Sequence, residues 1–276
     1  MKWWEGRLVG FDTETTDKSP LTARIITASI AHVQPDARPS VITWVIDSGC
    51  EVPEEASAVN GWTTEKIAAF LDGAPAIRIH GGVRMPMAVD GALGEIAGHL
   101  AVAMHTDTPV VVHNAAYDLT LLEQELARNS IDLLTARPTG IRGVVDTMVL
   151  EKQYDPYRKV KDGCRGGKYR CGGCGRTDKT LGSLCAHYGL VLPGAHRASV
   201  DAVAACRLAV KLMGLWPDVA RLKLATLHNH QVTWRREQSD SLREFWRRRD
   251  DPRWSEVDSG WPVHSALADG LVGVVA

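Results

Sequence analysis

The order of apolar runs along the chain is the feature that most constrains its fold. Three short apolar runs come first and predict strands at 6–13, 24–33 and 41–46, and the second of them is rich in β-branched residues. Their connections carry Pro, Asp and Gly, so we expect a meander of three antiparallel strands. Helical and strand-like stretches then alternate. This order predicts an α/β domain with a mixed central sheet flanked by helices.

Apolar residues at helical spacing and short apolar runs continue the pattern. The predicted helices are one that begins near Thr63 and those at 91–104, 115–128, 180–188 and 199–215. The predicted strands are 109–112 and 144–146, the second followed by a helical turn to about Tyr154. Residues 73–90 carry Pro and Gly and predict a loop with room for a short strand at 76–79. The stretch 216–249 predicts one or two helices, and 250–276 shows no clear period.

The composition is that of an ordinary globular protein. Of 276 residues, 45% are hydrophobic and 24% are charged, and the formal net charge is −1. No apolar run reaches the roughly 18 residues of a membrane span, and the start resembles no secretory signal. We therefore expect a cytoplasmic protein with no membrane partner. The near-zero charge excludes a general coat for nucleic acids, but it allows a nucleic-acid enzyme whose acidic site offsets basic patches.

Acidic residues stand where predicted strands end or helices begin. Asp12 and Glu14 are two apart in a strand and so share a face. Asp118 follows a buried strand, and Asp201 follows His196 by five residues at a helix start. Taken alone, each Asp is most simply a turn former or a helix cap. Taken together, converging carboxylates need protons or cations to neutralise them, and four of them suit a two-metal site for phosphodiester cleavage.

Three motifs in this order resemble the DEDDh 3′→5′ exonuclease family, which includes the proofreading epsilon subunit of bacterial DNA polymerase III, RNase T and oligoribonuclease. The motifs are FDTET at 11–15, HNAAYD at 113–118 and HRASVD at 196–201. Residues 57–72 also look like a family segment, with Asn60-Gly61 where the family usually has His-Gly. The resemblance covers about residues 5–215.

The resemblance implies a ribonuclease-H-like fold and a role for each matching residue. Two Mg²⁺ or Mn²⁺ ions would be held by Asp12, Glu14, Asp118 and Asp201. His196 would be the general base that takes a proton from the attacking water. Residues beside the substrate strand would be Thr13, Thr15, Asn114 and Tyr117. Tyr117 has core packing as an equal alternative, and Asp146 is expected behind the ligands or as a helix cap.

The implied activity is release of nucleoside 5′-monophosphates from free 3′ ends, with single-stranded DNA as the expected substrate. The exonuclease domain would cover 1–215 and the C-terminal extension 216–276. RNA trimming of the oligoribonuclease or RNase T type stays open, as does a non-catalytic nucleic-acid-binding polymerase accessory module. A DNA polymerase or another replication protein is a possible partner, and the composition suggests a bacterial or bacteriophage source.

A basic, Cys-rich insert at 155–179 interrupts the predicted domain. Cys164, Cys171 and Cys174 with the run CGGCG have the form of a zinc knuckle. Cys185 and His187 are candidates for the fourth ligand, with Asp178 a weaker one. Cys185 would equally suit a buried position on a helix. Structural zinc, reduced free thiols and a redox role all remain open, and the basic residues could guide a phosphate backbone.

The extension mixes Arg with aromatic residues. Arg235, Arg236, Arg243 and the run Arg247–Arg249 alternate with Trp234, Phe245 and Trp246. Such a surface could stack bases and contact phosphates. The simpler interpretation is an amphipathic helix docked on the domain, with Trp216, Trp254 and Trp261 as buried anchors.

Overall fold

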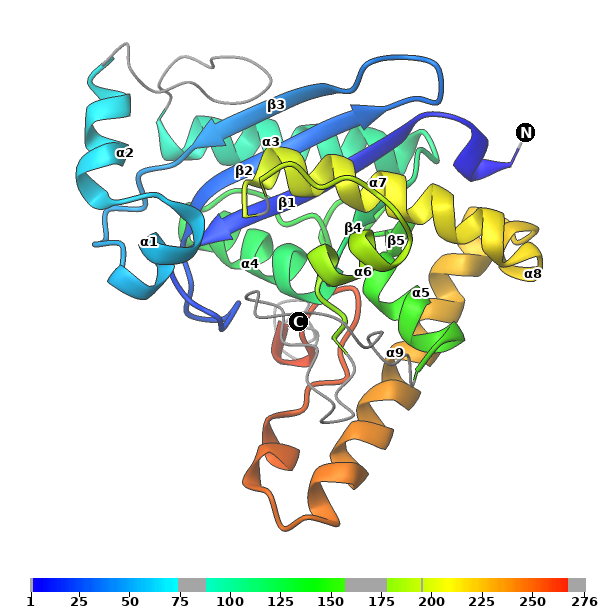
Figure 1. Cartoon of the computed structure of the whole chain (residues 1–276). Helices are drawn as coiled ribbons and strands as arrows, with labels where there is room; N and C mark the ends of the chain where they lie inside the picture. Colours follow the sequence, from blue (N-terminus) through cyan, green and yellow to red (C-terminus); the bar gives the residue numbers. More distant parts are fainter. Residues whose placement is uncertain (1, 74–87, 157–177, 195, 268–276) are drawn as a thin grey trace.

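A mixed sheet lies at the centre of the computed structural model, which describes residues 2–73, 88–156, 178–194 and 196–267 (Figure 1). The strands within these ranges are β1 (Leu8–Thr15), β2 (Ile25–Val33), β3 (Ser40–Val45), β4 (Val110–Val112) and β5 (Val144–Asp146). Their order across the sheet is β3-β2-β1-β4-β5. The first three form the predicted antiparallel meander, while β4 and β5 run parallel to β1. The predicted mixed α/β sheet is therefore confirmed.

Helices cover both faces of this sheet (Figure 1). On one face lie α3 (Val89–His105) and α4 (Ala115–Arg128), and on the other α6 (Leu181–His187), α7 (Ala198–Leu215) and α8 (Pro217–Ala220). The remaining helical segments are η1 (Trp3–Glu5), α1 (Glu54–Asn60), α2 (Thr64–Leu71), α5 (Thr147–Tyr154), α9 (Leu224–Arg247) and η2 (Pro252–Glu256). Each helix predicted from apolar spacing is present, whereas α1 was not predicted. The possible strand at 76–79 lies outside the described residues.

Strand β1 illustrates how alternation distributes side chains between the two faces. Val9 and Phe11 are buried in the core under α3 and α4. Leu8 belongs to the opposite core, and a Cβ at Gly10 would meet α7. Even-numbered residues of β1 thus face α7, and odd-numbered residues face α4. This alternation decides where the acidic side chains at the end of β1 point.

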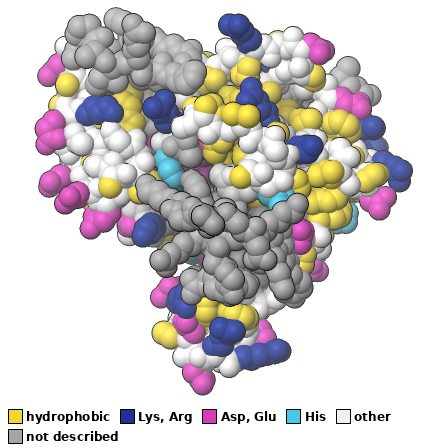
Figure 2. Space-filling view, viewed as in Figure 1, with side chains coloured by type: hydrophobic (Ala, Val, Ile, Leu, Met, Phe, Trp, Pro, Cys, Tyr) yellow, Lys and Arg dark blue, Asp and Glu magenta, His cyan; other side chains and the backbone are white. Residues whose placement is uncertain are grey.

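The described part of the extension packs against the sheet and its helices. Leu224 and Leu227 of α9 are buried in the core under α7, and Trp261 and Val263 are buried with α3 and α4. Trp216 stacks on Tyr154, with ring centroids 4.4 Å apart. The second half of α9 and η2 project from the domain (Figure 1). In Figure 2 this projecting end shows basic, acidic and hydrophobic side chains intermixed.

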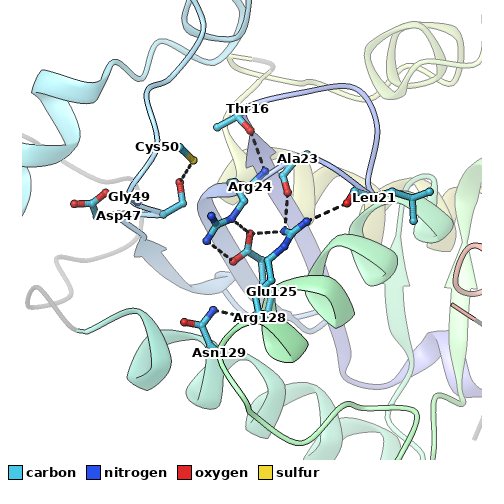
Figure 3. A network of polar contacts seen from close by, with 11 residues as sticks. Thr16, Leu21, Ala23, Arg24, Asp47, Gly49, Cys50, Glu125, Arg128 and Asn129 are labelled. Carbon is cyan, nitrogen blue, oxygen red and sulfur yellow. Dashed lines mark hydrogen bonds and ion pairs between the residues drawn. The ribbon is translucent and has the colours of Figure 1, made fainter. Parts of the chain in front are cut away.

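A buried ion-pair network ties the β1–β2 connection to α4 (Figure 3). Glu125 is fully buried, and its Oε1 lies 2.6 Å from Arg24 Nε and 3.1 Å from Arg128 Nη1. Arg128 also donates to the carbonyls of Leu21 and Ala23 at 3.0 Å. The network fixes the segment that follows the acidic end of β1.

Among the helices that the structure describes, none combines the length and the apolar character needed to cross a membrane. The cytoplasmic location stays a prediction.

Candidate active site

The site lies where β1 ends beside the start of α7. A Cβ built on Gly10 would stand 2.3 Å from the carbonyl oxygen of Ala202, so only glycine permits this approach of α7 to the strand. Asp201, the neighbour of Ala202, is thereby held against the even-numbered face of β1. That face carries Asp12 and Glu14, two and four residues beyond Gly10.

Three carboxylates converge at this point. Asp12, Glu14 and Asp201 each offer an oxygen, and these oxygens all lie within 4.8 Å of one another. They line a pocket together with Thr13, His113, Thr180, Leu181, Gly182, Leu192 and His196. The structure therefore brings together three of the four predicted ligands, and His196 lines the same pocket.

Asp118, the fourth predicted ligand, lies on the first turn of α4 beside this group. Its Oδ1 accepts hydrogen bonds from the Thr13 N–H at 3.0 Å and the Thr13 hydroxyl at 2.6 Å. The interaction joins α4 to the odd-numbered face of β1. Asp118 also acts on the charge of the cluster, because it raises the pKa of Asp12.

His196 stands two residues before the start of α7 and is held by Asp201 on the first turn of that helix. Its backbone N–H donates to Asp201 Oδ2 at 3.0 Å. The residue has a φ of +66°, a left-handed conformation that is uncommon outside glycine. The turn places His196 at the pocket that the carboxylates line.

The electrostatics of the cluster oppose full ionisation. Burial, and after it the charges of the neighbouring carboxylates, raise the pKa of Asp12 well above its usual range and that of Glu14 to about 8. Burial also raises the pKa of Asp118 to about 7, against the lowering effect of its Thr13 hydrogen bonds, and the pKa of Asp201 to about 6. At neutral pH these groups would share protons unless a cation neutralised them.

The donor set fits a divalent cation. Carboxylate oxygens are the ligands that Mg²⁺ and Mn²⁺ prefer. Asp201 Oδ1 is buried and has no hydrogen-bond partner among the described residues, as expected of an atom that binds a metal. The acidic group at the end of β1 could therefore hold a metal ion.

The predicted substrate-contacting residues lie around the end of β1. The hydroxyl oxygens of Thr15 and Tyr117 are 2.7 Å apart, and both groups donate to the carbonyl of Asp17. Tyr117 is only partly buried and packs against the core, so its two interpretations are compatible. Asn114 directly precedes α4 and has a φ of +73°. Thr13 is hydrogen-bonded to Asp118 on the first turn of the same helix.

Asp146 caps α5, which is one of the two roles predicted for it. It also binds the start of α4. It is buried, and its side chain accepts from the backbone N–H groups of Met148 and Val149 at the start of α5. It further accepts from Asn114 and Ala115 at the start of α4, at 3.1 and 2.9 Å. The carboxylate therefore fixes the helix that carries Asp118.

Sequence reasoning assigned no role to His113, although the residue begins the second motif. Its Nε2 lies 2.9 Å from the carbonyl of Lys179, and its Nδ1 lies 2.8 Å from the Thr147 hydroxyl. Burial lowers the pKa of His113, which favours a neutral ring that donates from Nε2. The ring anchors the residue at the end of the basic insert. The sequence signal that could have drawn attention to His113 was its position as the first residue of the motif HNAAYD.

Asn60 is a second residue whose place only the structure reveals. Its Nδ2 donates to the carbonyl of Thr15 at 3.3 Å, which brings α1 to the end of β1. Gly61, with a φ of +74°, ends α1 at this point. The signal in the sequence was that Asn60-Gly61 stands where the family usually has His-Gly.

The zinc prediction stays a prediction, because Cys164, Cys171 and Cys174 lie outside the described residues. Cys185 is buried among apolar side chains of α6 and α7, and burial raises the pKa of its thiol to about 11. His187 is exposed, with its ring against Tyr188. Packing accounts for Cys185 in the described structure.

Several arginines of the extension contact protein groups. Arg235 and Arg243 donate to the carbonyls of Asp258 and Val257, which attaches the last segment to α9. Of the three predicted anchors, Trp261 is buried, Trp216 is partly buried and Trp254 is exposed. The docked-helix interpretation thus describes the first half of α9.

The mixed sheet with helices on both faces is a ribonuclease-H-like fold, as the motifs implied. Solved structures with a similar fold include several of exonuclease I. No protein-family model and no curated protein matched the sequence in the corresponding searches.

Three of these structures show how far the similarity extends. Exonuclease I of E. coli with a dT13 oligonucleotide has 15% identity and a TM-score of 0.58, over 78% of this chain and 42% of the other. Exonuclease I of Methylocaldum szegediense has 18% identity and a TM-score of 0.55, over 87% and 46%. An ExoI/SSB-Ct complex has 14% identity and a TM-score of 0.57, over 78% and 43%. The match thus spans less than half of the length of these exonuclease I chains.

Proposed function

We propose that the protein is a metal-dependent 3′→5′ exonuclease that releases nucleoside 5′-monophosphates from single-stranded DNA. The observation that carries this proposal is the convergence of Asp12, Glu14 and Asp201 in one pocket with His196. The presence of all three motifs speaks against the alternative of a vestigial, non-catalytic accessory module.

Asp12, Glu14, Asp118 and Asp201 would hold two Mg²⁺ or Mn²⁺ ions. Such ions, when bound, would supply an activated water and neutralise charge on the leaving oxygen. His196 accepts the proton of the attacking water, a task suited to an imidazole side chain. Thr13, Thr15, Asn114 and Tyr117 orient the terminal nucleotide at the end of β1.

Single-stranded DNA is favoured over RNA by the dT13 oligonucleotide in the exonuclease I complex. RNA trimming is the second candidate, and 2′-hydroxyl contacts would decide between the two. The ExoI/SSB-Ct complex makes an SSB C-terminus a better-supported partner than a DNA polymerase, for which the support is the family resemblance alone.

The test is digestion of oligonucleotides labelled at either end, with Mg²⁺, Mn²⁺ or EDTA. A 3′ label should appear at once as mononucleotide, a 5′ label should give a descending ladder, and EDTA should stop both. Parallel single-stranded DNA, duplex DNA and RNA substrates rank the alternatives.

Two site variants and one control make the assignment specific. His196→Ala should lower kcat about 10²–10⁴-fold, the range for loss of a general acid or base, and Asp12→Asn should lower kcat by removing a metal ligand. Asp36→Asn alters an exposed carboxylate in the β2–β3 turn and should keep full activity. Full activity of the Asp12 or His196 variant would overturn the proposal.

A further inference from the structure

Helix α9 covers the open edge of the sheet with side chains in place of a further strand. β5 is the last strand in the order, so one row of its backbone groups faces no other described strand. Gln231, which is fully buried, accepts from the Asp146 N–H at 2.7 Å and donates to the Val144 carbonyl at 2.9 Å. His228 Nδ1 accepts from the Val144 N–H at 3.3 Å. Burial lowers the pKa of His228 to about 4, so the ring is neutral and can accept.

The segment after α9 reaches the same strand end from another direction. Trp261 Nε1 donates to Asp146 Oδ2 at 3.1 Å, and its ring lies 4.9 Å from that of His228. The Asp146 carboxylate therefore has five donors: the N–H groups of Asn114, Ala115, Met148 and Val149, and the indole of Trp261. Four of these donors are backbone amides at the starts of α4 and α5. The carboxylate can hold both helix starts in place only if it does not rotate. Trp261 is the one side chain among them.

These contacts lead from the extension to the metal-binding group. Asp146 holds the first amides of α4, and Asp118 lies one turn farther along that helix. The backbone N–H of His264 also donates to Thr120 Oγ1 on α4 at 2.7 Å. The extension therefore contacts α4 directly at Thr120 and reaches its start indirectly, through Asp146, so that the two contacts lie on either side of Asp118.

We propose that Trp261 and Gln231 are positioning residues of the active site. They fix Asp146, and through it the start of α4, so that Asp118 stands at the correct distance from Asp12 for a shared metal. The proposal rests on the proposed exonuclease function for the identity of the site. It makes the extension part of the catalytic machinery.

The central variant is Trp261→Phe, which keeps an aromatic ring in the core and removes the indole N–H. Trp254→Phe is the matched control, because Trp254 is exposed. Among the described residues, its ring makes a cation–π contact with Arg247. Mn²⁺ affinity without nucleic acid is measured by calorimetry on the full chain. Trp261→Phe should weaken it about ten-fold, the lower end of the effect of losing a group behind metal ligands, and Trp254→Phe should leave it unchanged.

Hydrogen exchange tests the route of the effect. The amides of Asn114 and Ala115 should lose protection in Trp261→Phe while those of β2 keep it. The kcat for oligonucleotide hydrolysis should fall with little change in KM, since the substrate contacts remain. If Trp261→Phe does not fold, Gln231→Met, which removes the acceptor for the Asp146 N–H, is measured in the same way.

The outcomes separate this proposal from the proposed function. Unchanged Mn²⁺ affinity and unchanged Asn114 protection in a folded variant would show that Trp261 only packs, and would overturn the positioning role even if the wild type is a nuclease. A weakened Mn²⁺ affinity in a protein that hydrolyses no nucleic acid would support the positioning role and overturn the exonuclease function. No Mn²⁺ binding by the wild type would overturn both.

Discussion

At the scale of single residues, the ionised carboxylates of the acidic cluster destabilise the folded protein. Buried carboxylates close together raise one another's pKa, since the charged forms are both poorly solvated and mutually repelled. Asp12, Glu14, Asp118 and Asp201 all show this direction. A bound cation would relieve this repulsion, so metal binding and folding would be linked.

The linkage predicts how the stability of the metal-free protein depends on pH. The pKa values of Glu14, Asp118 and Asp201 are about 8, 7 and 6 in the folded protein, against ordinary values near 4. At pH values between the ordinary pKa near 4 and these raised pKa values, the folded protein binds more protons than the unfolded chain. The free energy of unfolding therefore falls as pH rises through this range. Thermal melts in EDTA should show Tm decreasing from pH 5 to pH 8.

Added Mn²⁺ should raise Tm more at pH 8 than at pH 5, because it replaces the protons. Glu14→Gln removes one titrating group and should melt higher than the wild type in EDTA at pH 8. Glu244→Gln alters an exposed carboxylate and should not. An equal effect of Mn²⁺ at both pH values would contradict the linkage.

At the scale of elements, the site depends on two close contacts with β1. α7 approaches at Gly10, where no Cβ fits, and α4 approaches through the Asp118–Thr13 pair. The Arg24–Glu125–Arg128 network then fixes the connection after β1 (Figure 3). Each contact joins elements far apart in the sequence.

Gly10→Ala should displace α7 and with it Asp201. The added methyl would overlap the Ala202 backbone, and overpacking of this kind costs about 1–3 kcal/mol. We expect a lower Tm and a greater fractional loss of activity than of stability. Gly98→Ala on α3, where nothing lies within 4 Å of the new Cβ, should stabilise by up to about 1 kcal/mol. Chemical denaturation and the oligonucleotide assay measure both.

Glu125→Gln should destabilise the protein by about 1.5–3 kcal/mol, the range for hydrogen bonds to a charged group. The cost stays below that of a fully buried pair, because the Arg24 and Arg128 side chains are 26% and 29% exposed and can reach water. The exposed pair of Glu244 and Arg248 offers the control, since Glu244→Gln should change stability by less than about 1 kcal/mol. Equal urea midpoints for the two variants would contradict the assigned role of Glu125.

At the scale of the whole molecule, the extension completes the domain. Leu224 and Leu227 fill one core, Trp261 fills the other, and Gln231 satisfies the backbone of β5. The projecting end of α9 and η2 contributes little to either core. Phe245 there is 44% exposed and lies under Arg249.

Deletion of residues 216–276 should therefore prevent cooperative folding. Each large buried apolar side chain contributes about 1.5–3 kcal/mol, so the loss of several is comparable to the whole stability of a typical domain, about 5–15 kcal/mol. Circular dichroism and thermal melts of the 1–215 protein should show no sharp transition. Phe245→Ser in the full chain should melt like the wild type. A soluble 1–215 protein with a native-like melt would show that the extension is dispensable.

Much of the fold and of the site follows from local sequence. Periodicity of 2 and 3.6 predicts the strands and most helices, because a half-buried element must repeat its apolar residues at its own period. The two-residue spacing of Asp12 and Glu14 puts them on one face, and the motifs name the other site residues. The short helix α1 lacks such a pattern, since none of its residues is buried.

Tertiary structure alone decides which distant residues share an environment. The sequence by itself determined the meander, the alternation that follows and the identity of the acidic residues. It did not reveal that the missing side chain of Gly10 lets α7 approach β1, or that Asp146 binds the starts of two helices. Nor did it reveal that Gln231 and Trp261 of the extension hydrogen-bond to Asp146. These contacts depend on close packing and hydrogen-bond geometry between elements, which no local period encodes.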